Sequence, residues 1–210
     1  MMKEYRKRMM ITSLVTILPM FVGLLLWNKL PDTMATHFGS DNTPNGWSSK
    51  TFAVIGLPLF LLLLHWFSVG VTLNDPKKKN IGKMMFTVVF WIIPIVSLFA
   101  NGATLLYALG WKVDISLIIS ILVGFVFILL GNYLSKNRQN YTVGIKLPWT
   151  LSSEENWDKT HRMASKLWVV GGILIIANGF IRNTILLLFV LIMLIVVPTA
   201  YSFFLYRKQK

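Results

Sequence analysis

The longest polar interruption in this chain is residues 141–165, YTVGIKLPWTLSSEENWDKTHRMAS, which gathers two Trp, a Pro, a Gly, a His and charges of both signs. Ser152 and Glu155 have the spacing of a capping box, in which the Ser oxygen accepts a first-turn amide and the Glu reaches back to the cap amide. We therefore expect a helix to begin near Ser153. Because this stretch differs so strongly from its surroundings, it is the first place to look for function.

The expected helix has a charged surface and an apolar face. Two acid–base pairs stand at i,i+4 with the acid first, the favourable order on a helix: Glu155 with Lys159, and Asp158 with Arg162. A single face holds Trp157, His161, Ala164 and Trp168. That face continues into the apolar segment that begins near Leu167, so the pattern predicts a helix that begins outside the bilayer and enters it.

Long apolar runs determine the class of protein. The 210 residues are 55% hydrophobic and only 14% charged, with a mean hydropathy of +0.62, and about 20 apolar residues suffice to span a bilayer. We predict an all-α integral membrane protein with six transmembrane helices at residues 9–27, 52–73, 84–109, 115–134, 164–181 and 184–205. The last two are separated only by Arg182 and Asn183, so they should form an antiparallel hairpin.

The Lys and Arg residues predict the orientation. If the N-terminus is cytoplasmic, 17 of the 21 basic residues face the cytoplasm, and the outer side holds only Lys29, Lys50, Lys112 and Arg182. The positive-inside rule favours this arrangement, which places both termini on the cytoplasmic side of the membrane. The formal net charge of +13 then reflects topology and attraction to anionic membrane lipids, and not nucleic-acid binding, because the basic residues are spread over four loops.

The absence of cysteine removes several kinds of site. With no Cys in the chain, disulfides, haem attachment and thiolate metal sites are excluded. We expect no cofactor and no metal.

Residues 30–50 form the only long loop on the predicted outer side. Residues 33–38 alternate as a short strand does, and Pro44-Asn45-Gly46 has the composition of a hairpin turn. We therefore expect a small ordered flap. His37 with Asp32 and Asp41 could form a metal or proton site, but no His-Glu-x-x-His or similar ligand spacing accompanies them, which favours a hydrogen-bonded loop.

A few polar residues lie near or within the predicted spans: His65, Asn101, Asn132 and Asn178. Such residues either mark a functional site or join helices by hydrogen bonds. We favour the second interpretation, because no Asp, Glu, Lys or Arg lies well inside any span, which also argues against a proton-driven pump.

The order of spans and loops suggests two related halves. Each set of three spans has a long loop after its first span, and both loops contain Leu-Pro-x-Thr, at residues 30–33 and 147–150. This is the topology of an inverted 3+3 repeat. The corresponding domains are an N-terminal half, residues 1–110, with the outer loop 30–50, and a C-terminal half, residues 111–210, with the cytoplasmic loop 135–163.

A series of short motifs runs from the end of the fourth predicted span through the polar stretch: Gly131-Asn132-Tyr133, Asn140-Tyr141, Gly144-Ile145-Lys146, Pro148-Trp149-Thr150, Ser153, Trp157 and Thr160-His161-Arg162. In these motifs the chain resembles the SdpI-type immunity proteins of Gram-positive bacteria, and an implied location is the bacterial plasma membrane. The outer loop, with Leu30-Pro31-Asp32, His37, Pro44, Gly46-Trp47 and Lys50, is similar to the companion N-terminal domain of unknown function. The chain departs from the family pattern at Asn42, Asn45, Lys146 and Leu147.

This resemblance implies protection of the producing cell against a secreted antimicrobial peptide of the SdpC type. It also implies a second role, in which a transcriptional repressor is sequestered at the membrane. On the outer face, a strand edge and aromatic side chains suggest toxin contact by Asp32, His37, Phe38, Trp47 and Lys50. In the cytoplasmic loop, the candidate functional residues are Asn132, Asn140, Gly144, Lys146, Pro148, Trp149, Thr150, Trp157, Thr160, His161 and Arg162.

Two other classes of function remain open alternatives. One is a transporter for a small molecule or peptide. The other is a membrane-embedded metal-dependent enzyme, for which Glu154, Glu155, Asp158 and His161 could form a metal cluster. We expect a non-enzymatic protein, because Glu155 and Asp158 already have basic partners one turn away and the same spacing suits a plain amphipathic helix.

Overall fold

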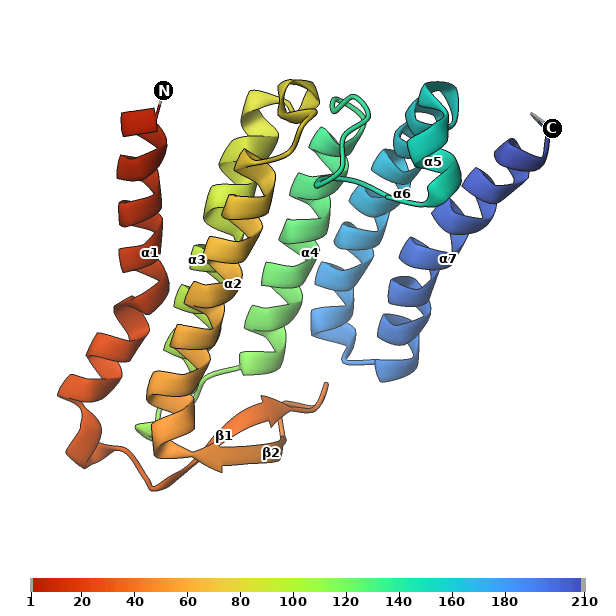
Figure 1. The fold of residues 1–210 in the computed structure, drawn as a ribbon. Helices are drawn as coiled ribbons and strands as arrows, with labels where there is room; N and C mark the ends of the chain where they lie inside the picture. The colour runs from red at the N-terminus through yellow and green to blue at the C-terminus, as the bar shows by residue number, and fades with distance from the viewer. Residues whose placement is uncertain (1, 209–210) are drawn as a thin grey trace. The chain divides into compact units, whose positions relative to one another are not determined.

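The computed structural model describes residues 2–208, and it is predominantly helical (Figure 1). Within that range, 6 helices are long and apolar enough to cross a membrane: Tyr5–Leu25, Phe52–Leu73, Lys83–Ala108, Ile115–Leu134, Glu154–Ile181 and Thr184–Lys208. The expectation of a six-span membrane protein is therefore confirmed at the level of the helices. Lys210, one of the residues used to predict the orientation, lies outside the described residues.

The chain divides into two compact units. The first comprises the described residues up to Ser68 together with Val89–Leu122, and the second comprises Val69–Val88 together with the described residues from Val123 onward.

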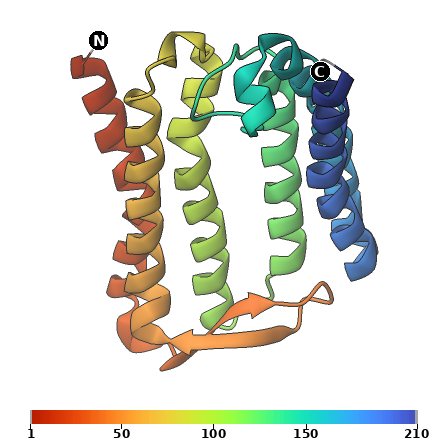
Figure 2. The same ribbon diagram turned by 45° about the vertical axis from the view of Figure 1, so that its right-hand side comes forward.

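The first unit contains a β-hairpin at the ends of its helices. After α1 (Met2–Leu25) and a short 3-10 turn, strands β1 (Thr33–Phe38) and β2 (Pro44–Ser49) pair antiparallel, and a π-helical turn, Phe52–Gly56, leads into α2 (Leu57–Leu73). Figure 2 shows the hairpin across the adjoining ends of α2, α3 (Lys83–Ala108) and α4 (Ile115–Leu134). Hydrophobic burial holds it there, in a cluster formed by Leu30, Met34, Ala53, Val54 and Leu105.

The predicted strand at residues 33–38 is confirmed, but the predicted turn is wrong. Pro44, Asn45 and Gly46 lie within β2, and residues 39–43 make the connection. The Asp41 carboxylate accepts hydrogen bonds from the backbone amide and the hydroxyl of Thr43, which closes the loop in an Asx-type turn. Gly46 instead allows β2 to pass close to His37 of β1, because a Cβ at position 46 would lie 2.8 Å from the Cβ of His37.

Hydrogen bonds in the first unit join its helices through buried polar side chains. Thr12 of α1 and His65 of α2 lie 2.8 Å apart between Oγ1 and Nε2, and the Ser97 hydroxyl of α3 donates to the Thr16 carbonyl of α1 at 2.7 Å. Asn101 donates to Ser97 one turn away. His65 therefore contributes to helix association, as expected, whereas the bond of Asn101 lies within α3 and supports the Ser97 side chain that reaches α1. Asn132, by contrast, is exposed on α4.

The second unit is built on an antiparallel helical hairpin. α6 (Glu154–Ile181) ends at Arg182, which adopts a left-handed conformation (φ 59°) and donates its amide to Asn178, and α7 (Thr184–Lys208) follows at once. The predicted hairpin is thus confirmed (Figure 1). Glycines let α4 approach α6 closely, because a Cβ at Gly131 would lie 2.9 Å from the Ser165 carbonyl and one at Gly124 would lie 2.5 Å from the Gly172 carbonyl.

The start of α6 differs slightly from the prediction. The N-cap is Ser153, whose hydroxyl accepts the Asn156 amide at 3.2 Å. The expected capping box of Ser152 and Glu155 is wrong, because Ser152 ends a separate short helix, α5 (Pro148–Ser152), and its hydroxyl donates to the Trp149 carbonyl. This helix was not foreseen, although Pro at a first helical position is a favourable start signal.

Candidate functional site

Residues 137–161 comprise the segment after α4, the short helix α5 and the start of α6. The segment before α6 folds back onto that helix and packs against residues 75–82, the connection between α2 and α3 in the same unit (Figure 2). We call these two segments the loop assembly. Polar side chains that are almost completely buried lie at its centre: Asp75, Asn137, Gln139, Asn140, Thr150, Asn156, Thr160 and His161. Burying a polar group costs free energy unless the group is hydrogen-bonded, so the stability of the loop assembly depends on its hydrogen-bond network.

Trp157 and His161 form the base of the loop assembly on α6. Trp157 has no exposed surface, and its ring stacks on the His161 imidazole with 3.9 Å between ring centres. The Trp157 indole N–H donates to the Asn137 carbonyl at 2.9 Å. Both residues lie on the face that the helical spacing predicted, and they bind the returning loop to the helix.

His161 has both ring nitrogens occupied. Its Nδ1 lies 2.7 Å from the Trp157 carbonyl, which can only accept a hydrogen bond, and its Nε2 accepts the Ile145 amide at 2.9 Å. This pairing requires the neutral imidazole with its proton on Nδ1. No lone pair is left for a metal ion, and the proposed set of Glu154, Glu155, Asp158 and His161 does not converge; within residues 2–208 no three His, Asp or Glu side chains form a possible metal cluster.

Gly144 allows the loop to pass directly over these two rings. Its φ of +126° is a conformation that residues with a side chain rarely adopt. A Cβ at this position would overlap His161 Nε2 and would lie 2.8 Å from a Trp157 ring carbon. The close approach of backbone to aromatic ring therefore depends on glycine.

Gln139 and Thr150 connect the loop to α5. The Gln139 amide donates to the carbonyls of Thr150 and Leu151 at 3.0 and 2.9 Å, and thereby satisfies carbonyls at the end of the short helix. The Thr150 hydroxyl accepts the Leu147 amide at 2.9 Å and lies 2.8 Å from the Ile145 carbonyl. Gln139 was not among the predicted site residues.

Asn140 organises the turn that follows. Its side-chain oxygen accepts the amides of Thr142 and Val143 at 3.1 and 2.7 Å, while its amide group donates to the Arg138 carbonyl at 2.9 Å. The predicted residue Asn140 is therefore a fully engaged turn residue inside the loop assembly.

Asp75 is the most informative residue that sequence reasoning missed. Its carboxylate accepts the Tyr141 amide and the Thr142 hydroxyl through one oxygen, at 2.9 and 2.8 Å. Its other oxygen accepts the Lys77 amide at 2.7 Å. The residue is 4% exposed. The available signal in the sequence is a single acid in Asn74-Asp75-Pro76, directly before the basic run of residues 77–79.

Further bonds complete the contact between the two segments. Asn80 donates to the Gln139 carbonyl at 2.7 Å and accepts the Arg138 amide at 3.0 Å, and the Gly82 amide donates to the Asn137 side chain at 2.8 Å. The Lys77 ammonium donates to the Gln139 side-chain oxygen at 2.6 Å. The linker that carries Lys77 is therefore a structural half of the loop assembly as well as a basic segment.

The part of the chain that forms the loop assembly matches a known protein family. The model of the SdpI/YfhL protein family matches residues 136–202, from the start of the returning loop through α5 and α6 and into α7. This match confirms, over residues 136–202, the resemblance that the sequence motifs indicate. A second model, of a domain of unknown function (DUF1648), matches residues 14–62, which include the β-hairpin.

One curated relative matches nearly end to end. It is named "Immunity protein SdpI" and comes from Bacillus subtilis (strain 168); it is 28% identical in an alignment of 209 residues that covers 96% of this chain and 97% of that protein. No solved structure matches the chain significantly.

The SdpI/YfhL region ends at Ser202, which two loop residues contact. Trp149 donates its indole N–H to the Ser202 hydroxyl at 2.9 Å, and Asn156 donates to the Ser202 carbonyl at 2.9 Å while accepting the Thr160 hydroxyl at 3.0 Å. α5 and the start of α6 are thus attached to α7. The predicted residues Trp149 and Thr160 belong to this second contact.

The remaining predicted residues of the cytoplasmic side are exposed. Lys146, Pro148 and Arg162 lie on the surface of the SdpI/YfhL region, and Asn132 lies on α4, before that region and outside the loop assembly. Of the two predicted ion pairs on α6, Glu155 with Lys159 forms at 2.6 Å, whereas Asp158 and Arg162 form no ion pair.

The β-hairpin of the DUF1648 region holds the other predicted residues. Lys50 forms an ion pair with Asp32 at 2.9 Å, His37 is hydrogen-bonded to Asn45, and Phe38 meets Tyr107 of α3 edge-on with ring centres 4.9 Å apart. Asn42 has φ 65° and anchors the connection by bonds to Val113 and Ser116. Trp47 is different: it is 59% exposed on β2.

Proposed function

We propose that this chain is a multi-pass membrane immunity protein that protects its cell against a secreted antimicrobial peptide. The observation that carries the proposal is the similarity to an immunity protein along almost the whole of both chains. A match of this extent includes both the DUF1648 region and the SdpI/YfhL region of this chain. The similarity to an immunity protein also points to a non-enzymatic role.

Orientation forms part of this proposal. With most basic residues on the cytoplasmic side, both termini and the loop assembly face the cytoplasm and the β-hairpin faces outward. A secreted peptide then meets the β-hairpin first.

The β-hairpin offers two features for peptide recognition. Its two-stranded sheet presents backbone groups at its edges, which an extended peptide can pair with, and Trp47 presents a large exposed ring, the kind of side chain that often anchors a partner. Its other face is packed on the helices through Met34. We therefore assign first contact with the peptide to the exposed face around Trp47, with Asp32, His37, Phe38 and Lys50 holding that face in shape.

The loop assembly supports a second candidate role, as the docking surface for a cytoplasmic partner such as a transcriptional repressor. The observation that favours it is a rigid, hydrogen-bonded base beneath exposed Tyr141, Lys146 and Pro148. A transmembrane helix can begin without such a hydrogen-bond network.

The primary experiment measures survival. The chain is expressed in a bacterium sensitive to a secreted peptide toxin, and survival is compared with that of cells that carry the empty vector. Immunity predicts survival at toxin concentrations that kill the control. Equal killing by each candidate toxin, at normal abundance of the protein in the membrane, would refute the proposed function.

Toxin contact is tested with a matched pair of tryptophans. Trp47→Ala should weaken binding of the toxin to purified protein about tenfold or more, since an anchoring aromatic residue is worth 2 kcal/mol or more. Trp111→Ala is the control, because Trp111 is 65% exposed in the α3–α4 connection and makes no part of the hairpin. Unchanged affinity in the Trp47 variant, or an equal loss in both, removes the β-hairpin from the contact.

A further inference from the structure

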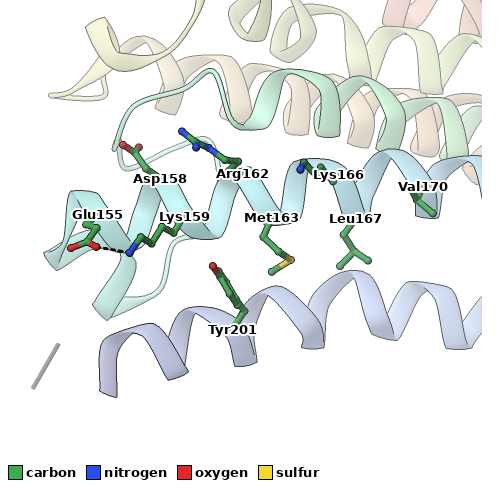
Figure 3. Close-up of a pocket in the computed structure, with 9 residues that line it drawn as sticks. All are labelled: Glu155, Asp158, Lys159, Arg162, Met163, Lys166, Leu167, Val170 and Tyr201. Carbon is green, nitrogen blue, oxygen red and sulfur yellow. Dashed lines mark hydrogen bonds and ion pairs between the residues drawn. The ribbon is translucent and has the colours of Figure 1, made fainter. Parts of the chain in front are cut away.

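An open groove of about 770 Å³ lies between α6 and α7 in the second unit. Figure 3 shows Met163 and Leu167 pointing from α6 toward α7, and Tyr201 pointing back toward α6. Basic side chains from three successive turns of α6 also line the groove: Lys159, Arg162 and Lys166. Past Lys166 the lining becomes apolar, with Leu167 and then Val170, which is 54% exposed.

Helix lengths place these basic residues within the polar surface of the bilayer. Between Lys166 and Arg182, α6 has only 15 uncharged residues, 167–181, which extend about 22 Å and fall short of a hydrocarbon core of about 30 Å. The neighbouring α7 has 23 uncharged residues, 184–206, which extend about 34 Å. Because the two helices form one hairpin and cross the same layer, the basic part of α6 must enter the headgroup region.

The position of Tyr201 on α7 also places the groove at the depth of the headgroup region. It lies six residues before Arg207, the first charged residue at that end of the helix, so the groove extends about 9 Å inward from that charge. Basic side chains at such a depth are stabilised when their charged ends meet headgroup phosphates and their stems lie along apolar surface.

The charge balance of the groove favours an anion. Lys159 is paired with Glu155 at 2.6 Å, and this pair contributes no net charge. Arg162 and Lys166 are exposed, and within residues 5–208 neither side chain makes an ion pair or a hydrogen bond to the protein. Asp158 is the other acid at the groove, and it forms no ion pair with Arg162. Two basic groups against one acid leave a net positive site.

We propose that this groove binds the headgroup of an anionic phospholipid. The phosphate lies between Arg162 and Lys166, where a guanidinium fork and an ammonium can both donate to its oxygens, and the acyl chains lie along Leu167 and Val170. The apolar continuation of the groove identifies the ligand as a lipid and not free phosphate, which has nothing to place there. This proposal does not depend on the immunity function.

The test measures which lipids stay bound to the purified protein in neutral detergent. Retained lipid is measured by native mass spectrometry during titration with phosphatidylglycerol or with phosphatidylcholine of the same acyl chains. We expect preferential retention of phosphatidylglycerol, and an apparent affinity about 10- to 30-fold lower in Arg162→Gln/Lys166→Gln, because each basic residue near a membrane surface contributes to anionic lipid binding. The charge-preserving variant Arg162→Lys/Lys166→Arg should keep most of the binding.

A matched control removes two other basic residues of the same unit. Lys79→Gln/Lys83→Gln loses the same charge from exposed positions outside the groove, so it should retain phosphatidylglycerol like the wild type. The proposal is overturned by an equal loss in this control, by equal retention of the two lipids, or by displacement of the lipid by millimolar inorganic phosphate, which would identify a free-phosphate site.

Discussion

Replacement of Gly144 by Ala tests whether the loop assembly is held by close packing on His161 and Trp157. The backbone conformation at φ +126° costs a residue with a Cβ about 1–3 kcal/mol. The added methyl group, 2.8 Å from a Trp157 ring carbon, adds an overpacking cost of about 1–3 kcal/mol. Together the two costs span about 2–6 kcal/mol, and a value in the lower half of that range, about 3 kcal/mol, already corresponds to about a 100-fold larger open population of the loop.

Limited proteolysis measures that population directly. Arg138 and Lys146 are exposed trypsin sites within the loop assembly, and cleavage there requires the hydrogen-bonded loop to open. When opening and closing are fast relative to cleavage, the cleavage rate follows the equilibrium population of the open form. In detergent-solubilised protein we therefore expect cleavage in Gly144→Ala about 100-fold faster than in the wild type, with the products identified by mass spectrometry.

Gly110→Ala provides the control for backbone strain alone. Gly110 has φ +85° in the α3–α4 connection, and a Cβ there would meet nothing within 4 Å. This variant should leave cleavage at Lys146 unchanged. If Gly144→Ala is cleaved at the wild-type rate, the loop does not pack on the two rings as described, and the account of the loop assembly is wrong.

Three further predictions concern the network, the helix base and the topology. Asp75→Asn replaces a carboxylate that accepts three hydrogen bonds, so it should destabilise the loop by about 1–3 kcal/mol; wild-type resistance to trypsin at Arg138 would contradict this. Trp157→Ala should cost about 3–5 kcal/mol because the ring is completely buried, and membrane abundance and toxin protection should fall together; loss of protection at normal abundance would instead indicate direct participation. Cysteines introduced at the exposed positions Lys112 and Ser135 test the topology with an impermeant labelling reagent on intact cells. We expect labelling at position 112 and protection at position 135. The reverse pattern would show that the orientation is inverted.

Local patterns in the sequence were sufficient for the helices and for part of the site. Apolar runs of about 20 residues identify spans because hydropathy is a property of neighbouring residues, and the six predicted spans correspond to the six long helices. The spacing of Trp157, His161 and Ala164 likewise placed them on one buried face, since a helix brings every third or fourth residue to the same side. The strand at residues 33–38 followed from alternation in the same way.

Only the tertiary structure decided how the polar residues are used. Asp75 and Tyr141 are 66 positions apart in the chain, yet the carboxylate of one accepts the amide of the other, and no local pattern relates them. The same holds for the hairpin turn: Asn45-Gly46 has the composition of a turn, but contacts of Asn42 with Val113 and Ser116, more than 70 positions away, favour the connection at residues 39–43. Periodicity records which side of a helix or strand is buried, whereas a hydrogen bond between distant segments depends on where packing brings them, and that information is spread over the whole chain.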